Sequence, residues 1–166
     1  MKKWELPIII LLLIVISAGI IINTNSNIPK YSNYVYIPPK PQKVDPLEVE
    51  RLTNEYRVSK GLSPLVHDER LCTAAQTKLD DMVKRDYYAH NTPDGKLPWT
   101  FFTGSYYKLG ENLSDANNTA VGTIKAWQVS PKHNDNLLES VYRQTCVKTH
   151  YRGFQSELVV AWYGNI

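Results

Sequence analysis

The hydrophobic pattern divides the chain into an apolar N-terminal run, a polar spacer and a longer region with changing periods. The 17 residues from Leu6 to Ile22 carry no charge and are almost wholly apolar. In a helix with a rise of about 1.5 Å per residue, such a run reaches roughly 26 Å, enough to cross a bilayer core. We therefore predict a membrane anchor over residues 1–22, with a cleaved signal peptide as the alternative.

Charges around this run predict its orientation. Lys2 and Lys3 precede it, and the next cation is Lys30. Because cytoplasmic flanks are enriched in cations, we expect a single-pass membrane protein with an extracellular C-terminal domain, or a secreted protein if the run is cleaved. Residues 23–45 are rich in proline and lack apolar periodicity, which predicts an extended linker. Residues 46–166 remain for one compact domain.

Helical periods dominate the first half of this domain. Asp45 and Pro46 form an N-cap and first-turn pair, and Gly61 is placed to end that helix. A second helix is predicted from about Asp68. Its apolar positions recur at helical spacing: Leu71, Ala74, Ala75, Leu79 and Met82.

Later segments predict further helices and then strands. A third helix is expected over residues 119–129, and Ser130–Pro131 starts a shorter one that ends near Leu138. Residues 144–151 and 157–163 have the pattern of strands, and the second is apolar on both faces. Residues 91–118 show no strong period and are expected to form a long functional loop. We predict an α+β fold, a three-layer α-β-α sandwich.

Charge excludes one class of partner. Residues 46–166 hold 14 Lys or Arg and 14 Asp or Glu, so the net charge of +3 comes from the first 45 residues. A neutral domain lacks the electrostatic footprint of a nucleic-acid-binding protein.

Several short motifs occur in a characteristic order. They are Asn54–Arg57, Gly61–Leu65, the helix Leu71–Met82, Tyr88–His90, Gly110–Asn112 and Trp127–His133. Together they resemble the CAP superfamily of cysteine-rich secretory, antigen-5 and pathogenesis-related proteins, which includes bacterial SCP-like extracellular proteins. The resemblance runs from about residue 47 to 163 and implies an α-β-α sandwich with a large open cleft.

The resemblance also implies a set of cleft residues. Many members carry two histidines and two acidic residues in the cleft, and some bind zinc or another divalent metal there. His90 and Glu111 match this set, and His133 is similar to the histidine of a bacterial Ser-Pro-x-His pattern. Asp94 is similar to the bacterial Asp-Gly after the first histidine. Ser130 stands where the eukaryotic Trp-x-x-Glu pattern has its acid.

This residue set suits Zn²⁺, because imidazole and carboxylate are its usual ligands and an open position can activate water. The predicted metal ligands are His90, Glu111, His133 and Asp94, and the first three are also candidate catalytic residues. The alternative is that Glu111 only positions the loops. We expect a membrane-anchored binding or scaffold module more than an enzyme. The alternatives are a metal-dependent hydrolase of envelope peptide or peptidoglycan, and a lipid or sterol carrier.

The ligand of the cleft stays open between a small molecule, a lipid, a glycan and a peptide. Aromatic residues are frequent near the expected cleft and suit each of these classes. They are Tyr87, Tyr88, Trp99, Phe101, Phe102, Tyr106 and Tyr107.

Two cysteines in an exported chain predict a disulfide between Cys72, on the second helix, and Cys146, on a strand. The alternative is two buried free thiols. Ser130 and Ser114 are candidate nucleophiles near His133 and Glu111, although an N-cap role explains Ser130 better.

Three further polar residues are interpreted without a role in the cleft. Asn54 and Arg57 are expected to tie the first helix to neighbouring loops. His67 is expected on a solvent-exposed loop.

Overall fold

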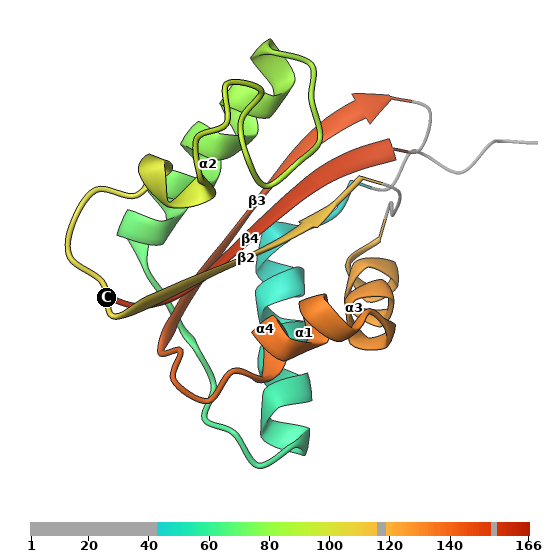
Figure 1. The fold of residues 1–166 in the computed structure, drawn as a ribbon. Helices are drawn as coiled ribbons and strands as arrows, with labels where there is room; N and C mark the ends of the chain where they lie inside the picture. The colour runs from blue at the N-terminus through green and yellow to red at the C-terminus, as the bar shows by residue number, and fades with distance from the viewer. Residues whose placement is uncertain (1–42, 116–118, 154–155) are drawn as a thin grey trace, which may run out of the picture. The chain divides into compact units, whose positions relative to one another are not determined.

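A computed structural model of the chain describes residues 43–115, 119–153 and 156–166 (Figure 1). The predicted anchor at residues 1–22 and the linker up to residue 42 lie outside the described residues. Within the described part, no helix has the length and apolar character needed to cross a membrane. The elements, in chain order, are α1 (Pro46–Ser59), β1 (Val66–His67), α2 (Glu69–Lys84), η1 (Pro98–Phe101), β2 (Lys108–Ser114), α3 (Ala120–Val129), α4 (Pro131–Leu138), β3 (Gln144–Gly153) and β4 (Ser156–Asn165).

A four-stranded sheet forms the middle layer, with strand order β1-β3-β4-β2. β3 pairs antiparallel with β4, β4 pairs antiparallel with β2, and the short β1 runs parallel to β3. Helix α2 covers one face of the sheet, and α1, α3 and α4 lie on the other (Figure 1). The predicted α-β-α sandwich is therefore the observed arrangement of the described domain.

Strand β4 explains why two separate cores form. Leu158, Val160 and Trp162 belong to the cluster under α2. Val159, Ala161 and Tyr163 belong to the cluster under α1, α3 and α4. All six are fully buried, as expected for a strand whose alternate side chains both face helices.

The helix ends agree with the sequence signals. The Asp45 carboxylate accepts a hydrogen bond from the Leu47 N–H, and the Asp68 carboxylate accepts one from Arg70 N–H. Gly61 has φ of +77°, the left-handed conformation that ends a helix. These bonds satisfy backbone donors that a helix start would otherwise leave without partners.

Asn54 and Arg57 hold α1 to its neighbouring loops, as predicted. The Asn54 amide makes two hydrogen bonds with the Leu65 backbone. Arg57 is 1% exposed, and its guanidinium donates to three carbonyl oxygens, those of Ser63, Leu137 and Glu139. These hydrogen bonds offset part of the free-energy cost of burying the charge, which would otherwise be strongly destabilising.

Two sequence interpretations are corrected. The expected loop at residues 91–118 contains β2 and the 3₁₀ helix η1. β2 shows no alternation because six of its seven residues are buried, including the polar Glu111 and Asn112. His67, expected on a loop, lies in β1, where main-chain pairing with β3 places it at the sheet edge. Its side chain is 40% exposed.

Residue Val44, assigned to the linker from sequence, packs against the domain. It is 2% exposed, and its N–H donates to the Glu157 carboxylate at 2.6 Å. The packed region thus reaches back to Val44, two residues before α1.

The predicted disulfide between Cys72 and Cys146 is present and joins α2 to β3. The cysteines are 74 positions apart in the chain. Under the chain-entropy view, closing such a loop stabilises the fold by about 4 kcal/mol. The bond therefore supplements the hydrophobic cluster on the α2 face.

We predict that the protein, denatured without reductant and treated with an alkylating agent, carries no alkyl group on either cysteine. Mass spectrometry measures the number of alkylated cysteines. Reduction should lower the free energy of unfolding by about 4 kcal/mol, measured by urea denaturation. A Cys72→Ala/Cys146→Ala variant should show the lower value with and without reductant. Two alkylated cysteines in the untreated protein would contradict the pairing.

Candidate functional site

Glu111 lies at the centre of the candidate site because of strand register. On β2 it stands directly opposite Trp162 of β4. The Trp162 indole N–H donates to Glu111 Oε2 at 2.9 Å, and Glu111 Oε1 lies 2.8 Å from His90 Nδ1. The Glu111 side chain is 1% exposed and that of His90 is 53% exposed. A buried carboxylate thus orients a solvent-accessible imidazole.

Lys78 on α2 holds the backbone around His90. This lysine is fully buried, and its Nζ donates to the carbonyl oxygens of Ala89 and His90 at 2.7 and 2.8 Å. The ammonium also lies 4.7 Å from the centre of the Tyr87 ring. Burial lowers the pKa of Lys78, because a charged group loses its hydration there.

Asparagine side chains attach α4 to β2. Asn112 donates to the His133 carbonyl at 3.0 Å, and Asn136 donates to the Glu111 carbonyl at 3.0 Å and to Asn112 Oδ1 at 2.8 Å. Pro131 at the first position of α4 starts the helix so that His133 falls in its first turn. His133 is therefore positioned by contacts to the strand that carries Glu111.

His133 occupies a partly desolvated position beside Trp127, whose ring centre lies 6.3 Å from that of the imidazole. Burial and the nearby His90 both lower the pKa of His133 below its ordinary value of 6.5. Both imidazoles belong to residues that line the same hollow. A lowered pKa keeps His133 neutral at physiological pH, the form that binds metals and accepts protons.

Two adjoining hollows open onto these groups. One, of about 530 Å³, is lined by His90, Glu111 and His133 together with Ser130, Pro131, Lys132 and Asn136. The other, of about 420 Å³, shares four of these residues. Its remaining lining is Asn91, Leu97, Pro98, Trp99, Lys108, Leu109, Gly110 and Tyr142. We call the two together the cleft. Its size is that of ordinary small-ligand sites.

Gly110 is required where the cleft meets the protein interior. A Cβ at this position would lie 2.2 Å from the Tyr142 hydroxyl and 2.9 Å from Asn136 Oδ1. Any larger residue would displace Tyr142 or the amide that anchors α4.

Asp94 lies outside the set of residues that line the cleft. Its carboxylate accepts a hydrogen bond from Arg85 at 2.9 Å and lies 3.4 Å from Lys96 Nζ. Hydrogen bonds from Thr92 and these cations hold the pKa of Asp94 well below its usual range. Three of the four predicted ligands, His90, Glu111 and His133, thus line one hollow, and Asp94 does not.

The candidate serines differ in position. Ser130 is the N-cap residue of α4, as expected, but its side chain makes no capping hydrogen bond. The residue is part of the cleft lining. Ser114 is 6% exposed at the end of β2 and does not line the cleft.

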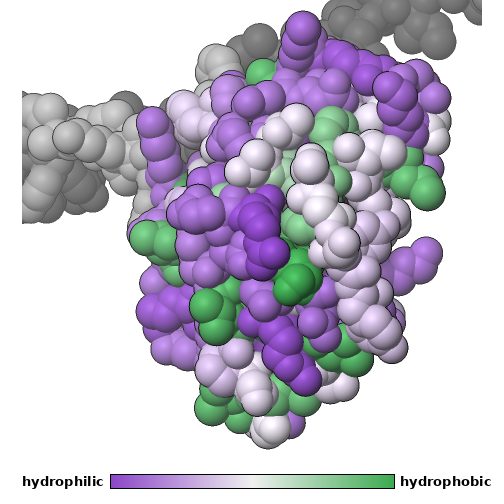
Figure 2. Space-filling model, turned by 90° about the vertical axis from the view of Figure 1, so that its left-hand side faces the viewer, coloured by the Kyte–Doolittle hydropathy of each residue, from purple (hydrophilic) through white to green (hydrophobic). Residues whose placement is uncertain are grey.

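The seven aromatic residues noted in the sequence also separate. Trp99 lines the cleft and meets Trp162 edge to face, with ring centres 6.0 Å apart. Phe102 is buried, and Tyr107 is 80% exposed. Among the described residues on the face shown in Figure 2, hydrophobic side chains are scattered between polar ones.

Sequence reasoning did not single out Lys78, Trp162, Asn112 or Asn136 as parts of this site. Their roles depend on strand register and on carbonyl groups, which have no local sequence signal. The Gly-Glu-Asn motif pointed to Asn112 only as part of the resemblance.

In the described part of the chain, His90, Glu111 and His133 of the cleft do not form a group of three whose ligand atoms all lie within 4.8 Å of one another. Within residues 43–115, 119–153 and 156–166, one group of three metal-ligating side chains has its ligand atoms within 4.8 Å of one another. That group is His67, Cys72 and Cys146, and its cysteines form the disulfide.

Part of this chain is similar in sequence to a bacterial protein. The Bacillus subtilis protein YkwD, described as uncharacterized, is 36% identical over 94 residues, which are 55% of this chain and 37% of YkwD. This chain therefore matches well under half the length of that relative.

Solved structures share the fold. A Bacillus anthracis extracellular protein containing an SCP domain superposes with a TM-score of 0.64 at 22% identity, over 73% of this chain and 40% of that protein. A cysteine-rich secretory protein from Staphylococcus aureus gives a TM-score of 0.59 at 23% identity, over 72% and 38%. The sequence model of the CAP family, described as the cysteine-rich secretory protein family, matches residues 50–164. This chain therefore belongs to the CAP family.

Proposed function

We propose that this protein is an exported CAP-domain binding module that holds a cell-envelope peptide or glycan in the cleft. The observation that carries the proposal is the convergence of His90, Glu111 and His133 on adjoining hollows. The apolar N-terminal run supports export and tethering to the membrane, with the domain outside the cell. The extracellular description of the Bacillus anthracis relative agrees with this location.

The two walls of the cleft favour an amphipathic ligand. Leu97, Pro98 and Trp99 give one hollow an apolar wall. His90, Lys132 and Asn136 present polar groups to both hollows. A sugar ring or a peptide side chain suits the aromatic wall, and hydroxyl, amide or carboxylate groups suit the polar one.

A divalent metal such as Zn²⁺ is the proposed cofactor of the cleft. Glu111 uses one oxygen for Trp162 and the other for His90 Nδ1. Such a carboxylate usually orients a metal-binding imidazole and increases its basicity. His90, through Nε2, and His133 would hold the ion, and Glu111 would act behind His90. The bound metal would supply a Lewis acid that polarises a ligand carbonyl.

A metal-dependent hydrolase is the second candidate function. It is favoured by the pairing of His90 with a buried carboxylate and by the position of Ser130 in the cleft lining. A carboxylate–imidazole pair can take up a proton from water or a hydroxyl group. Binding without turnover distinguishes the module from the enzyme.

We predict that the purified full-length protein binds peptidoglycan fragments and that a His90→Ala/His133→Ala variant binds them at least about tenfold more weakly. The loss of two cleft imidazoles removes polar contacts worth on the order of 1–2 kcal/mol. Isothermal titration with and without added Zn²⁺ gives the affinities.

His150→Ala is the matched control, because His150 is exposed on β3 and does not line the cleft. Equal affinity of the double variant and the wild type would contradict the proposed site. Release of cleaved fragments by the wild type but not by the double variant would establish the hydrolase instead.

We further predict that the His133 imidazole titrates below pH 6.5 in an NMR pH titration. In a His90→Ala variant its pKa should rise, because one of the two lowering causes is removed. Since the unfolded chain binds this proton more tightly, His133 should make stability fall as the pH drops through 6.5 towards the lower folded-state pKa. An unchanged His133 pKa in His90→Ala, beside an unchanged value in His150→Ala, would show that the imidazoles do not share a site.

A further inference from the structure

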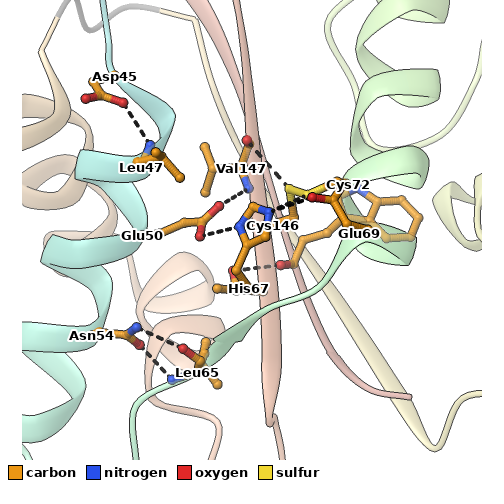
Figure 3. A network of polar contacts seen from close by, with 12 residues as sticks. Asp45, Leu47, Glu50, Asn54, Leu65, His67, Glu69, Cys72, Cys146 and Val147 are labelled. Atoms are coloured by element: carbon orange, nitrogen blue, oxygen red, sulfur yellow. Dashed lines mark hydrogen bonds and ion pairs between the residues drawn. A yellow bond between two sulfur atoms is a disulfide. The ribbon is translucent and has the colours of Figure 1, made fainter.

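A second cluster of groups that can bind a metal contains the two cysteines of the disulfide and the nearby His67 (Figure 3). Cys72 comes from α2, Cys146 from β3 and His67 from β1. His67 Nε2 lies 3.2 Å from Cys72 Sγ, and the ligand atoms of all three residues lie within 4.8 Å of one another. None of these residues lines the cleft.

The other nitrogen of His67 is fixed from the opposite layer. His67 Nδ1 lies 2.8 Å from Glu50 Oε2, and Glu50 Oε1 accepts a hydrogen bond from the Val147 N–H at 2.9 Å. Glu50 belongs to α1 and is 8% exposed (Figure 3). When Nδ1–H donates to a carboxylate, the lone pair is on Nε2, the nitrogen that faces the sulfur. This is the carboxylate–histidine arrangement found behind metal ligands.

The Glu69 carboxylate lies beside the same nitrogen, although it does not belong to the group whose ligand atoms all lie within 4.8 Å of one another. Glu69 Oε1 is 3.5 Å from His67 Nε2, and the Glu69 side chain is 86% exposed. Glu69, Cys72 and Thr73 line a hollow of about 300 Å³ at the protein surface. The hollow therefore lies beside the disulfide, whose cysteines are themselves buried, with Cys72 2% and Cys146 0% exposed.

We propose that the reduced form of the Cys72–Cys146 pair, with His67 and Glu69, is a binding site for Zn²⁺ or a similar thiophilic divalent cation. The four ligands are two thiolates, one imidazole and one carboxylate, a set that Zn²⁺ binds tetrahedrally. With Zn–S near 2.3 Å and Zn–N near 2.0 Å, neighbouring ligand atoms lie roughly 3.5–3.8 Å apart. The 3.2 Å separation between His67 and Cys72 is close to that spacing.

Metal binding and the disulfide exclude each other. A dithiol reductant gives two electrons and two protons to the S–S bond. The reductant becomes a disulfide, and the protein is left with two thiols. Binding of Zn²⁺ then releases the two thiol protons and forms two Zn–S bonds. The same cysteines therefore cross-link the domain when oxidised and hold a metal across the same interface, between α2 and β3, when reduced.

The test is a Co²⁺ and Zn²⁺ titration of the full-length protein in detergent, after anaerobic reduction with a phosphine. Reduced wild type should bind one Co²⁺ with thiolate-to-cobalt charge-transfer absorption, which Zn²⁺ removes by competition. The oxidised protein should show no such band. Ions bound by the cleft give no thiolate absorption, so failure here is separate from failure of the proposed function.

Variants identify the ligands. His67→Ala, or His67→Gln if that variant does not fold, should weaken Co²⁺ binding at least about tenfold, and Glu50→Gln by roughly 10- to 100-fold. His150→Ala should match wild type. Circular dichroism checks that each reduced variant is folded, and Zn²⁺ should raise the thermal midpoint of the reduced wild type.

Absence of the charge-transfer band in reduced wild type would overturn the proposal. The proposal would also be overturned if both His67 variants bound Co²⁺ as tightly as the wild type. A reduced chain that stays unfolded with Zn²⁺ present would overturn it as well.

Discussion

The hydrogen bond from the Trp162 indole to the Glu111 carboxylate is the constraint on which the cleft depends. It joins residues that stand opposite each other on β2 and β4, so it follows directly from strand register. A slip of one residue would turn Glu111 towards the opposite face of the sheet. The bond also partly satisfies a carboxylate that is otherwise almost completely withdrawn from water.

From this point the site is extended by contacts to backbone rather than by contacts between side chains alone. Glu111 orients His90, and Lys78 holds the carbonyl groups of that loop. Asn112 and Asn136 fix α4 on the other side. The carbonyl contacts explain how segments far apart in sequence meet at one cleft while the imidazoles remain accessible.

Much of the fold could be predicted because its signals are local. Asp45, Asp68 and Gly61 mark helix ends through their own backbone and side-chain chemistry. The apolar run of β4 identified a strand buried on both faces, and hence three layers. β2 was missed because its polar residues are buried through long-range hydrogen bonds. His67 was misplaced because a two-residue strand has no period to detect. Of the site, the residue types were predicted from the resemblance, whereas the engagement of Asp94 with Arg85 depends on the folded loop.

The most direct test of the central claim is the tautomer of the neutral His90 ring, determined from ¹⁵N chemical shifts and couplings of the imidazole. Glu111 can only accept a hydrogen bond when ionised, so the neutral ring should carry its proton on Nδ1 and its lone pair on Nε2. Replacing Glu111 with alanine should remove this preference. A His90 ring with its proton on Nε2 in the wild type would contradict the account, because Glu111 would then have no donor at Nδ1 and would not orient the imidazole.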